Sequence, residues 1–181
     1  MGTLESNGIV DDVGRRIDYL FKPETAMISV SRKLEVNPAD GSAGIKLNRQ
    51  QVWVGLVRKA ENAVPYVEAI TSCVVVQQQP ERLIREVVLH GETLQELILF
   101  FPEERVEFVR LSGQAKGLIK NIIEEDPDGT LHLRFTFDMV LEGVEPGSEK
   151  EKEFAAGMEA AYLDAVRTTL RRIRDEAVAQ A

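Results

Sequence analysis

From residue 83 to residue 141, hydrophobic and polar positions alternate in short segments, a pattern typical of strands with one buried face. Residues 131–141 show it most clearly, because every odd position is apolar and every even position except Val140 is polar. From Ser148 to about Val178 the apolar positions recur at helical spacing instead. These patterns predict an antiparallel sheet followed by one long amphipathic helix.

The region before this sheet supplies the remaining elements. Residues 25–36 alternate like a first strand, and Asn48 begins a helix with a capping-box pattern. Pro65 ends that helix, and residues 66–70 are predicted to form a second short helix. The expected order in a single domain, residues 25–181, is a strand, two short helices, a six-stranded meander and a long helix.

Residues 1–24 form an N-terminal extension to this domain. Ile9, Val13 and Ile17 fall at helical spacing, and Pro23 follows as a stop signal. The segment is compatible with a short amphipathic helix or with a mobile tail.

Three turns predict how strands of the meander pair. Pro127 and Gly129 suit a hairpin loop between Asp126 and Thr130, which sets Asn121 opposite Phe135. A one-residue shift would bury Lys116 and Lys120 on the apolar face at a large cost, so that register is rejected. The outer face should therefore carry Lys116, Lys120, His132 and Arg134.

The other turns extend this register across the meander. Pro102-Glu103-Glu104 sets Ile98 opposite Phe108 and Glu96 opposite Arg110. A tight turn at Gly91-Glu92 is expected to set Leu89 opposite Leu94 and Arg85 opposite Ile98. In this register Arg85 lies diagonal to the pair formed by Glu96 and Arg110.

The inward face of the predicted sheet is mostly apolar, with four polar exceptions: Arg85, Glu96, Arg110 and Asn121. Charges on such a face are costly unless they pair with one another. The group could orient the polar head of an apolar ligand, or it could be a salt-bridge network that closes one end of the sheet. Both interpretations stay open on the sequence.

Several apolar and aromatic positions could form the wall of a ligand cavity: Phe108, Phe135, Phe137, Met139 and Met158. The same residues are equally typical of an ordinary core. Tyr162 lies on the inner face of the long helix, where its hydroxyl needs a polar partner. That partner could be a ligand or the group around Arg110.

Other candidates for chemistry are weak. His90 and His132 fall on the outward face, so a histidine base or metal ligand inside a cavity is not expected. Glu96 beside two arginines should stay ionised and be a poor base, and Cys73 has no identifiable base to activate it. No metal-ligand spacing or phosphate loop occurs, so neither a metal nor a cofactor is predicted.

Composition limits the partners and the compartment. The 181 residues include 30 acidic and 22 basic side chains, a net charge of −8 that argues against nucleic-acid binding. A single cysteine and the lack of a long apolar run indicate a cytoplasmic protein that does not insert into membranes. A homodimer is compatible with the sequence.

The order of elements resembles the helix-grip fold of the START and birch-pollen-allergen superfamily, also called SRPBCC. Several short sequence segments, spread over roughly residues 27–175, more specifically resemble the AtaL-like branch of this superfamily. They are Gln51-Val52-Trp53, Asn62-Ala63-Val64-Pro65, Ile70-Thr71-Ser72-Cys73, Arg85-Glu86, Glu104-Arg105-Val106, Leu111-Ser112-Gly113, Asn121 to Asp126, Leu133-Arg134-Phe135-Thr136-Phe137, and Gly157-Met158-Glu159 with Tyr162. The resemblance implies an α+β fold, with a seven-stranded antiparallel sheet wrapped around the long helix. It also implies a cavity for a hydrophobic or aromatic small molecule between sheet and helix.

Three functional hypotheses follow. The first is intracellular binding of a hydrophobic small molecule with a polar head. The second is an enzyme using the same pocket, such as a natural-product cyclase or isomerase that stabilises charge near Arg85 and Arg110. The third is a structural or regulatory domain whose cavity is filled by its own side chains.

Overall fold

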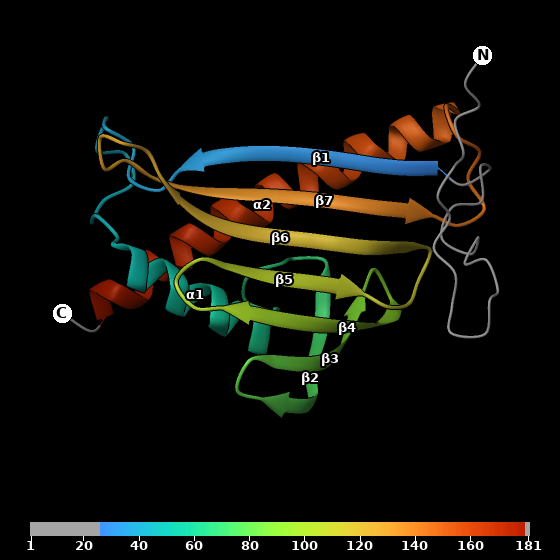
Figure 1. The fold of residues 1–181 in the computed structure, drawn as a ribbon, viewed down its shortest axis with the longest axis horizontal. Helices are drawn as coiled ribbons and strands as arrows, with labels where there is room; N and C mark the ends of the chain where they lie inside the picture. The colour runs from blue at the N-terminus through green and yellow to red at the C-terminus, as the bar shows by residue number, and fades with distance from the viewer. Residues whose placement is uncertain (1–25, 180–181) are drawn as a thin grey trace, which may run out of the picture.

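The computed structural model describes residues 26–179, which form one antiparallel sheet and two helices (Figure 1). The elements are β1 (Ala26–Glu35), α1 (Arg49–Glu61), β2 (Ile70–Gln79), β3 (Arg82–Leu89), β4 (Glu92–Phe101), β5 (Arg105–Arg110), β6 (Ala115–Glu125), β7 (Leu131–Leu141) and α2 (Glu149–Ala179). The strand order is β1-β7-β6-β5-β4-β3-β2, so the first strand pairs with the last. This arrangement confirms the predicted α+β helix-grip fold.

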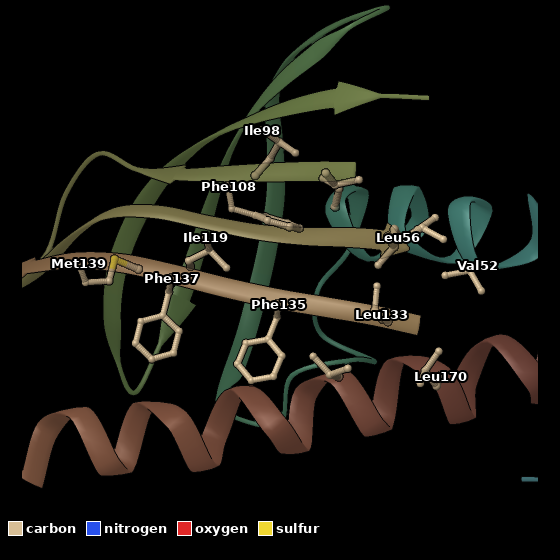
Figure 2. Close-up of a cluster of buried hydrophobic side chains, with 14 of the residues drawn as sticks. Val52, Leu56, Ile98, Phe108, Ile119, Leu133, Phe135, Phe137, Met139 and Leu170 are labelled. Carbon is tan, nitrogen blue, oxygen red and sulfur yellow. The ribbon is translucent and has the colours of Figure 1, made fainter. Parts of the chain in front are cut away.

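The alternation along β7 produces the main core. Leu133, Phe135, Phe137 and Met139 are fully buried. The rings of Phe135 and Phe137 point from the sheet toward α2 (Figure 2). On the opposite face Arg134 forms an ion pair with Glu124, as expected for a polar outer surface. The other outward positions, Lys116 and Lys120, pair with Glu142 and Glu107, and His132 lies 3.4 Å from Asp126.

Two of the three predicted turns have the expected register. In the loop between β6 and β7, the Asp126 amide donates to the Thr130 carbonyl, and Gly129 adopts a positive φ of 84°. Asn121 consequently lies opposite Phe135. In the loop between β4 and β5, Phe101 lies opposite Arg105, which aligns Glu96 with Arg110. Local turn chemistry was sufficient to set both hairpins.

The predicted register between β3 and β4 was wrong by two residues. Arg85 lies directly opposite Glu96, and Leu89 lies opposite Glu92. The cause is a two-residue turn at His90 and Gly91, which both have positive φ, 50° and 80°. A positive φ is uncommon for histidine, so the sequence favoured a turn one residue later. Because the error is an even number, the side chains within β3 and β4 keep their predicted faces.

The second short helix predicted for residues 66–70 is absent. After α1 the chain makes a single turn, in which the amides of Tyr66 and Val67 both donate to the Ala63 carbonyl at 3.0 Å. Pro65 has no amide hydrogen, and β2 already begins at Ile70. The space between Pro65 and β2 is too short for a helix to continue.

The first helix begins as the sequence predicts. The Asn48 side chain accepts a hydrogen bond from the Gln51 amide, and the Gln51 side chain accepts one from the Asn48 amide. This reciprocal pair satisfies two amides at the start of α1. Along the helix, Val52 and Leu56 are fully buried against the sheet and α2 (Figure 2).

The long helix crosses one face of the sheet (Figure 1), and its two halves differ in burial. The buried residues of α2 all lie between Ala165 and Ile173. Gly55 of α1 permits this contact, because a Cβ atom there would lie 2.1 Å from the Ile173 Cγ1. The half before Ala165 has half-buried and exposed residues but none that is fully buried, and it covers a cavity.

The predicted N-terminal extension, residues 1–24, lies outside the described residues. Within residues 26–179, neither helix is both long and apolar enough to cross a membrane.

Candidate functional site

A cavity of about 490 Å³ lies between the sheet, the end of α1 and the N-terminal half of α2. Small residues on the helix, Gly157, Ala161 and Ala165, contribute to its wall and leave space beneath them. Gly157 and Ala161 are also exposed to solvent, as is His90 across the cavity, so these residues surround the mouth. The cavity is therefore not filled by the side chains of the described chain, contrary to the premise of the structural-domain hypothesis.

Most of the predicted ligand-binding residues line this cavity. They are Arg85, Glu96, Phe108, Arg110, Asn121, Met158 and Tyr162. Phe135, Phe137 and Met139 do not line it, because they are fully buried in the core beneath the helix. His90, expected on the outward face, also lines the cavity, because its positive φ places it in the turn beyond the regular alternation of β3.

Arg85 and Glu96 form the tightest polar contact of the site. The Arg85 Nε and Nη2 donate to the same Glu96 oxygen at 2.9 and 2.7 Å, and both side chains are at least 96% buried. Arg85 Nη1 donates to the carbonyls of Lys59 and Ala60 at 2.9 and 2.8 Å. These carbonyls belong to the last turn of α1 and have no partner within the helix. Arg85 therefore caps α1 and anchors it to the sheet.

Arg110 is held much more loosely on the same face. Its Nε and Nη2 lie 3.4 Å from the second Glu96 oxygen, and its Nη2 lies 3.4 Å from the Tyr162 hydroxyl oxygen. Its Nη1 makes no hydrogen bond to any residue in the described range. A guanidinium group carries five N–H donors, so Arg110 retains donors that can serve a molecule in the cavity.

Tyr162 places a second donor beside Arg110. Its ring packs on Phe137 and Phe135, with ring centroids 5.0 and 6.3 Å away. Its oxygen accepts from Arg110, while no residue of the described chain accepts its own proton. Burial is the main cause that raises the pKa of Tyr162 above 10.0, so the hydroxyl remains a donor at neutral pH. Tyr162 and Arg110 together present two unused donors to the cavity.

Lys59 is a cavity residue that the sequence interpretation missed. It lies in the last turn of α1, is 7% exposed, and its Nζ donates to the Asn121 Oδ1 at 2.9 Å. This bond gives the buried amide of Asn121 a polar partner, which the sequence pattern did not identify. The helical spacing contained a signal, because Lys59 follows the buried Val52 and Leu56 by seven and three positions.

The electrostatic environment of Lys59 is unfavourable for its charge. Burial and the nearby Arg85 lower its pKa from 10.5 to about 8, with Glu96 acting in the opposite direction. The Phe108 ring centroid lies 5.7 Å from the Lys59 Nζ. Lys59 forms no salt bridge with a described carboxylate, because Glu96 is occupied by the two arginines. The charged form still predominates at pH 7, but the neutral fraction is on the order of a hundredfold larger than for an unperturbed lysine.

Other chemical groups contribute little to the cavity. Cys73 lies in β2 against the end of α1, with its Sγ 3.7 Å from the Glu61 carbonyl oxygen, and it does not line the cavity. Among residues 26–179, no group of three or more His, Cys, Asp or Glu side chains could hold a metal ion.

A ligand-sized cavity between a seven-stranded antiparallel sheet and a long C-terminal helix defines a helix-grip protein of the SRPBCC class. Within that class, residues 30–179 match the family model AtaL, described as acetylaranotin biosynthesis cluster protein L. The chain therefore belongs to the AtaL family. None of the curated proteins matches the sequence.

Solved structures with the same fold include several proteins named as aromatase/cyclases. The ZhuI aromatase/cyclase from Streptomyces sp. R1128 is 12% identical with a TM-score of 0.66, over 83% of this chain and 96% of that one. The di-domain aromatase/cyclase StfQ of the steffimycin pathway is 9% identical with a TM-score of 0.65, over 84% of this chain and 52% of its own. The di-domain aromatase/cyclase BexL of the BE-7585A pathway is 15% identical with a TM-score of 0.59. The match covers 82% of this chain and 49% of BexL. At these identities the comparison shows the shared fold, and the chain spans about half of each di-domain protein.

Proposed function

We propose that this protein binds a hydrophobic or aromatic small molecule whose carbonyl, enolate or carboxylate end contacts Arg110 and Tyr162. The observation that carries this proposal is the pair of donors without a described acceptor, Arg110 Nη1 and the Tyr162 hydroxyl, in one cavity. A cavity of about 490 Å³ falls within the usual range for ligand pockets. Apolar walls with a few convergent polar groups are typical of such sites.

The two arginines have different roles in this proposal. Arg85 has its donors occupied by Glu96 and by the carbonyls of α1, so it holds the fold together. Arg110 has long contacts and unused donors, so it can bind a ligand without breaking a strong bond. The salt-bridge interpretation therefore applies to Arg85, and the ligand interpretation applies to Arg110.

A second candidate function is ring closure or isomerisation of a polyketide-like molecule in the same cavity. Two observations favour it: the names of structures with this fold, and a donor pair suited to stabilising an enolate oxygen. Glu96 has one oxygen paired with Arg85 and the other with Arg110, so neither is free to face a ligand. Binding is therefore the function that the arrangement supports best.

Two naphthalene probes test the proposed head-group site. Binding of 2-naphthoate and of 2-ethylnaphthalene is measured by fluorescence titration for the parent protein, Arg110→Met and the outer-face control Arg134→Met. We expect Arg110→Met to weaken 2-naphthoate about 10- to 100-fold, because a charge-assisted hydrogen bond is lost, and to leave 2-ethylnaphthalene unchanged. Arg134 pairs with Glu124 outside the cavity, so its variant should bind like the parent.

Arg110→Met leaves Glu96 paired with Arg85, so a single substitution isolates the binding role without stranding a buried carboxylate. Equal affinity of the parent and Arg110→Met for 2-naphthoate contradicts the proposal. So does a parent protein that binds neither probe.

A further inference from the structure

The Lys59 amine occupies an unusual position for a lysine. Its side chain reaches from the last turn of α1 into the same cavity as Arg110 and Tyr162. Only 7% of the residue is exposed, although lysines are almost never fully buried without a charged partner. Of its three possible donors, one is used, in the 2.9 Å bond to Asn121.

The surroundings favour the uncharged form of this amine. Burial removes water from the amine, and Arg85 brings a second positive charge to the same face. These two causes outweigh the attraction of Glu96 and lower the pKa of Lys59 to about 8. Neutral lysines in apolar pockets are nucleophiles toward carbonyl carbon, which is how imine-forming lysines are activated.

We propose that Lys59 captures an aldehyde or ketone ligand as an imine within the cavity. The proposal rests on the proposed function, since the carbonyl compound must enter the same cavity. In the first step the nitrogen lone pair attacks the carbonyl carbon, and the C=O π electrons move to oxygen, which takes up a proton as nitrogen loses one. The resulting carbinolamine expels its hydroxyl group as water, and the C=N bond forms. The net reaction consumes one amine and one carbonyl and releases one water, with no oxidation or reduction.

The arrangement indicates the class of ligand. Lys59 lies on one element of the cavity wall, α1, while Arg110 and Tyr162 approach from β5 and α2. A molecule with two carbonyl groups can therefore place one oxygen at Arg110 and offer a second carbonyl carbon to Lys59. Aromatic or partly cyclised poly-ketones have this chemistry together with an apolar body.

Reductive trapping tests the imine directly. The full-length protein is incubated with 2-naphthaldehyde and sodium cyanoborohydride, which delivers hydride to the imine carbon and leaves a stable secondary amine. Intact mass and peptide mapping then locate the adduct. We expect rapid, single-site labelling at Lys59, with a rate that reaches half its maximum near pH 8. Surface lysines such as Lys116, whose side chain is 41% exposed, should react slowly.

Two variants and one competitor complete the test. Lys59→Arg keeps the charge and a donor for Asn121 but cannot form the imine, so labelling should fall at least about tenfold. Lys116→Met should label at Lys59 like the parent. An excess of 2-naphthoate should slow labelling at Lys59 without slowing labelling at the surface.

The outcomes separate this inference from the proposed function. If 2-naphthoate binding depends on Arg110 but no adduct maps to Lys59, the imine inference is wrong and the binding proposal stands. If the adduct forms at Lys59 while Arg110→Met binds 2-naphthoate like the parent, the proposed head-group site at Arg110 is wrong. The inference that Lys59 forms an imine is then still supported. Labelling spread equally over surface lysines, with no preference for Lys59, also overturns the inference.

Discussion

The two halves of α2 differ in how closely they approach the rest of the molecule. In the C-terminal half, Val166, Thr169, Leu170 and Ile173 are buried, and Ile173 fits against Gly55 of α1. In the N-terminal half, Phe154, Met158 and Tyr162 are only half-buried and line the cavity. One continuous helix therefore packs into the core at its C-terminal end and forms a wall of the cavity at its N-terminal end.

The same division applies to the polar residues of the inward face. Arg85 joins the packed end, because it links Glu96 of the sheet to the last carbonyls of α1. Arg110 joins the cavity end, because its contacts are long and it meets Tyr162 of the N-terminal half of α2. The two arginines thus differ in role because Arg85 lies under the end of α1, whereas Arg110 lies under the cavity half of α2.

The largest expected effect comes from removing the arginine of the packed end. Arg85→Met leaves Glu96 with only its long contacts to Arg110 and strands two carbonyls of α1, so we expect a loss of about 3–5 kcal/mol in the free energy of unfolding. Arg110→Met should cost much less, because Glu96 keeps its strong partner. Urea denaturation followed by circular dichroism measures both. Equal destabilisation by the two substitutions would remove the distinction between the two ends.

The second prediction concerns the pH dependence of stability caused by Lys59. Below pH 8 the amine is charged in both the folded and the unfolded states, so the full cost of its burial is present. Between about pH 8 and 10.5 the folded protein releases a proton that the unfolded chain retains, so stability rises with pH. Relative to Lys59→Met, the parent should gain on the order of 3 kcal/mol across this window.

The measurement is the difference in unfolding free energy between the two proteins at a series of pH values. Taking the difference removes the contributions of other groups, including Arg85 and Glu96, that remain in both proteins. If this difference stays constant from pH 8 to 10.5, folding does not lower the pKa of Lys59 and the prediction is wrong.

The smallest expected effect compares two glycines on the two helices. A Cβ at Gly55 would lie 2.1 Å from Ile173 Cγ1, whereas a Cβ at Gly157 meets nothing within 4 Å. Gly55→Ala should cost about 1 kcal/mol net, since overpacking outweighs the gain in helix propensity. Gly157→Ala should stabilise the protein by about 0.5–1 kcal/mol. Thermal unfolding of both variants tests this, and shifts in the same direction would contradict the difference in packing between the halves of α2.

Much of the fold could be predicted because local patterns decide it. The alternation of residues 131–141 predicts which side chains face inward, and the chemistry of the Asp126–Thr130 turn sets their partners across the hairpin. The start of α1 at Asn48 and the length of α2 follow from capping and helical spacing. At the β3–β4 turn the local pattern favoured the wrong residues, because His90 adopts a positive φ.

The sequence by itself determined the strand faces, the long helix and the family, since each depends on neighbouring residues or on motifs. It also placed Arg85, Glu96, Arg110 and Asn121 on one face. Only the tertiary structure decided which of these groups is structural, that Phe135 and Phe137 are core, and that Lys59 reaches the cavity. The physical reason is that periodicity assigns a side chain to a face but not to a depth. The depth depends on how closely α2 packs over each part of the sheet, and this differs between its buried C-terminal half and the half that lines the cavity.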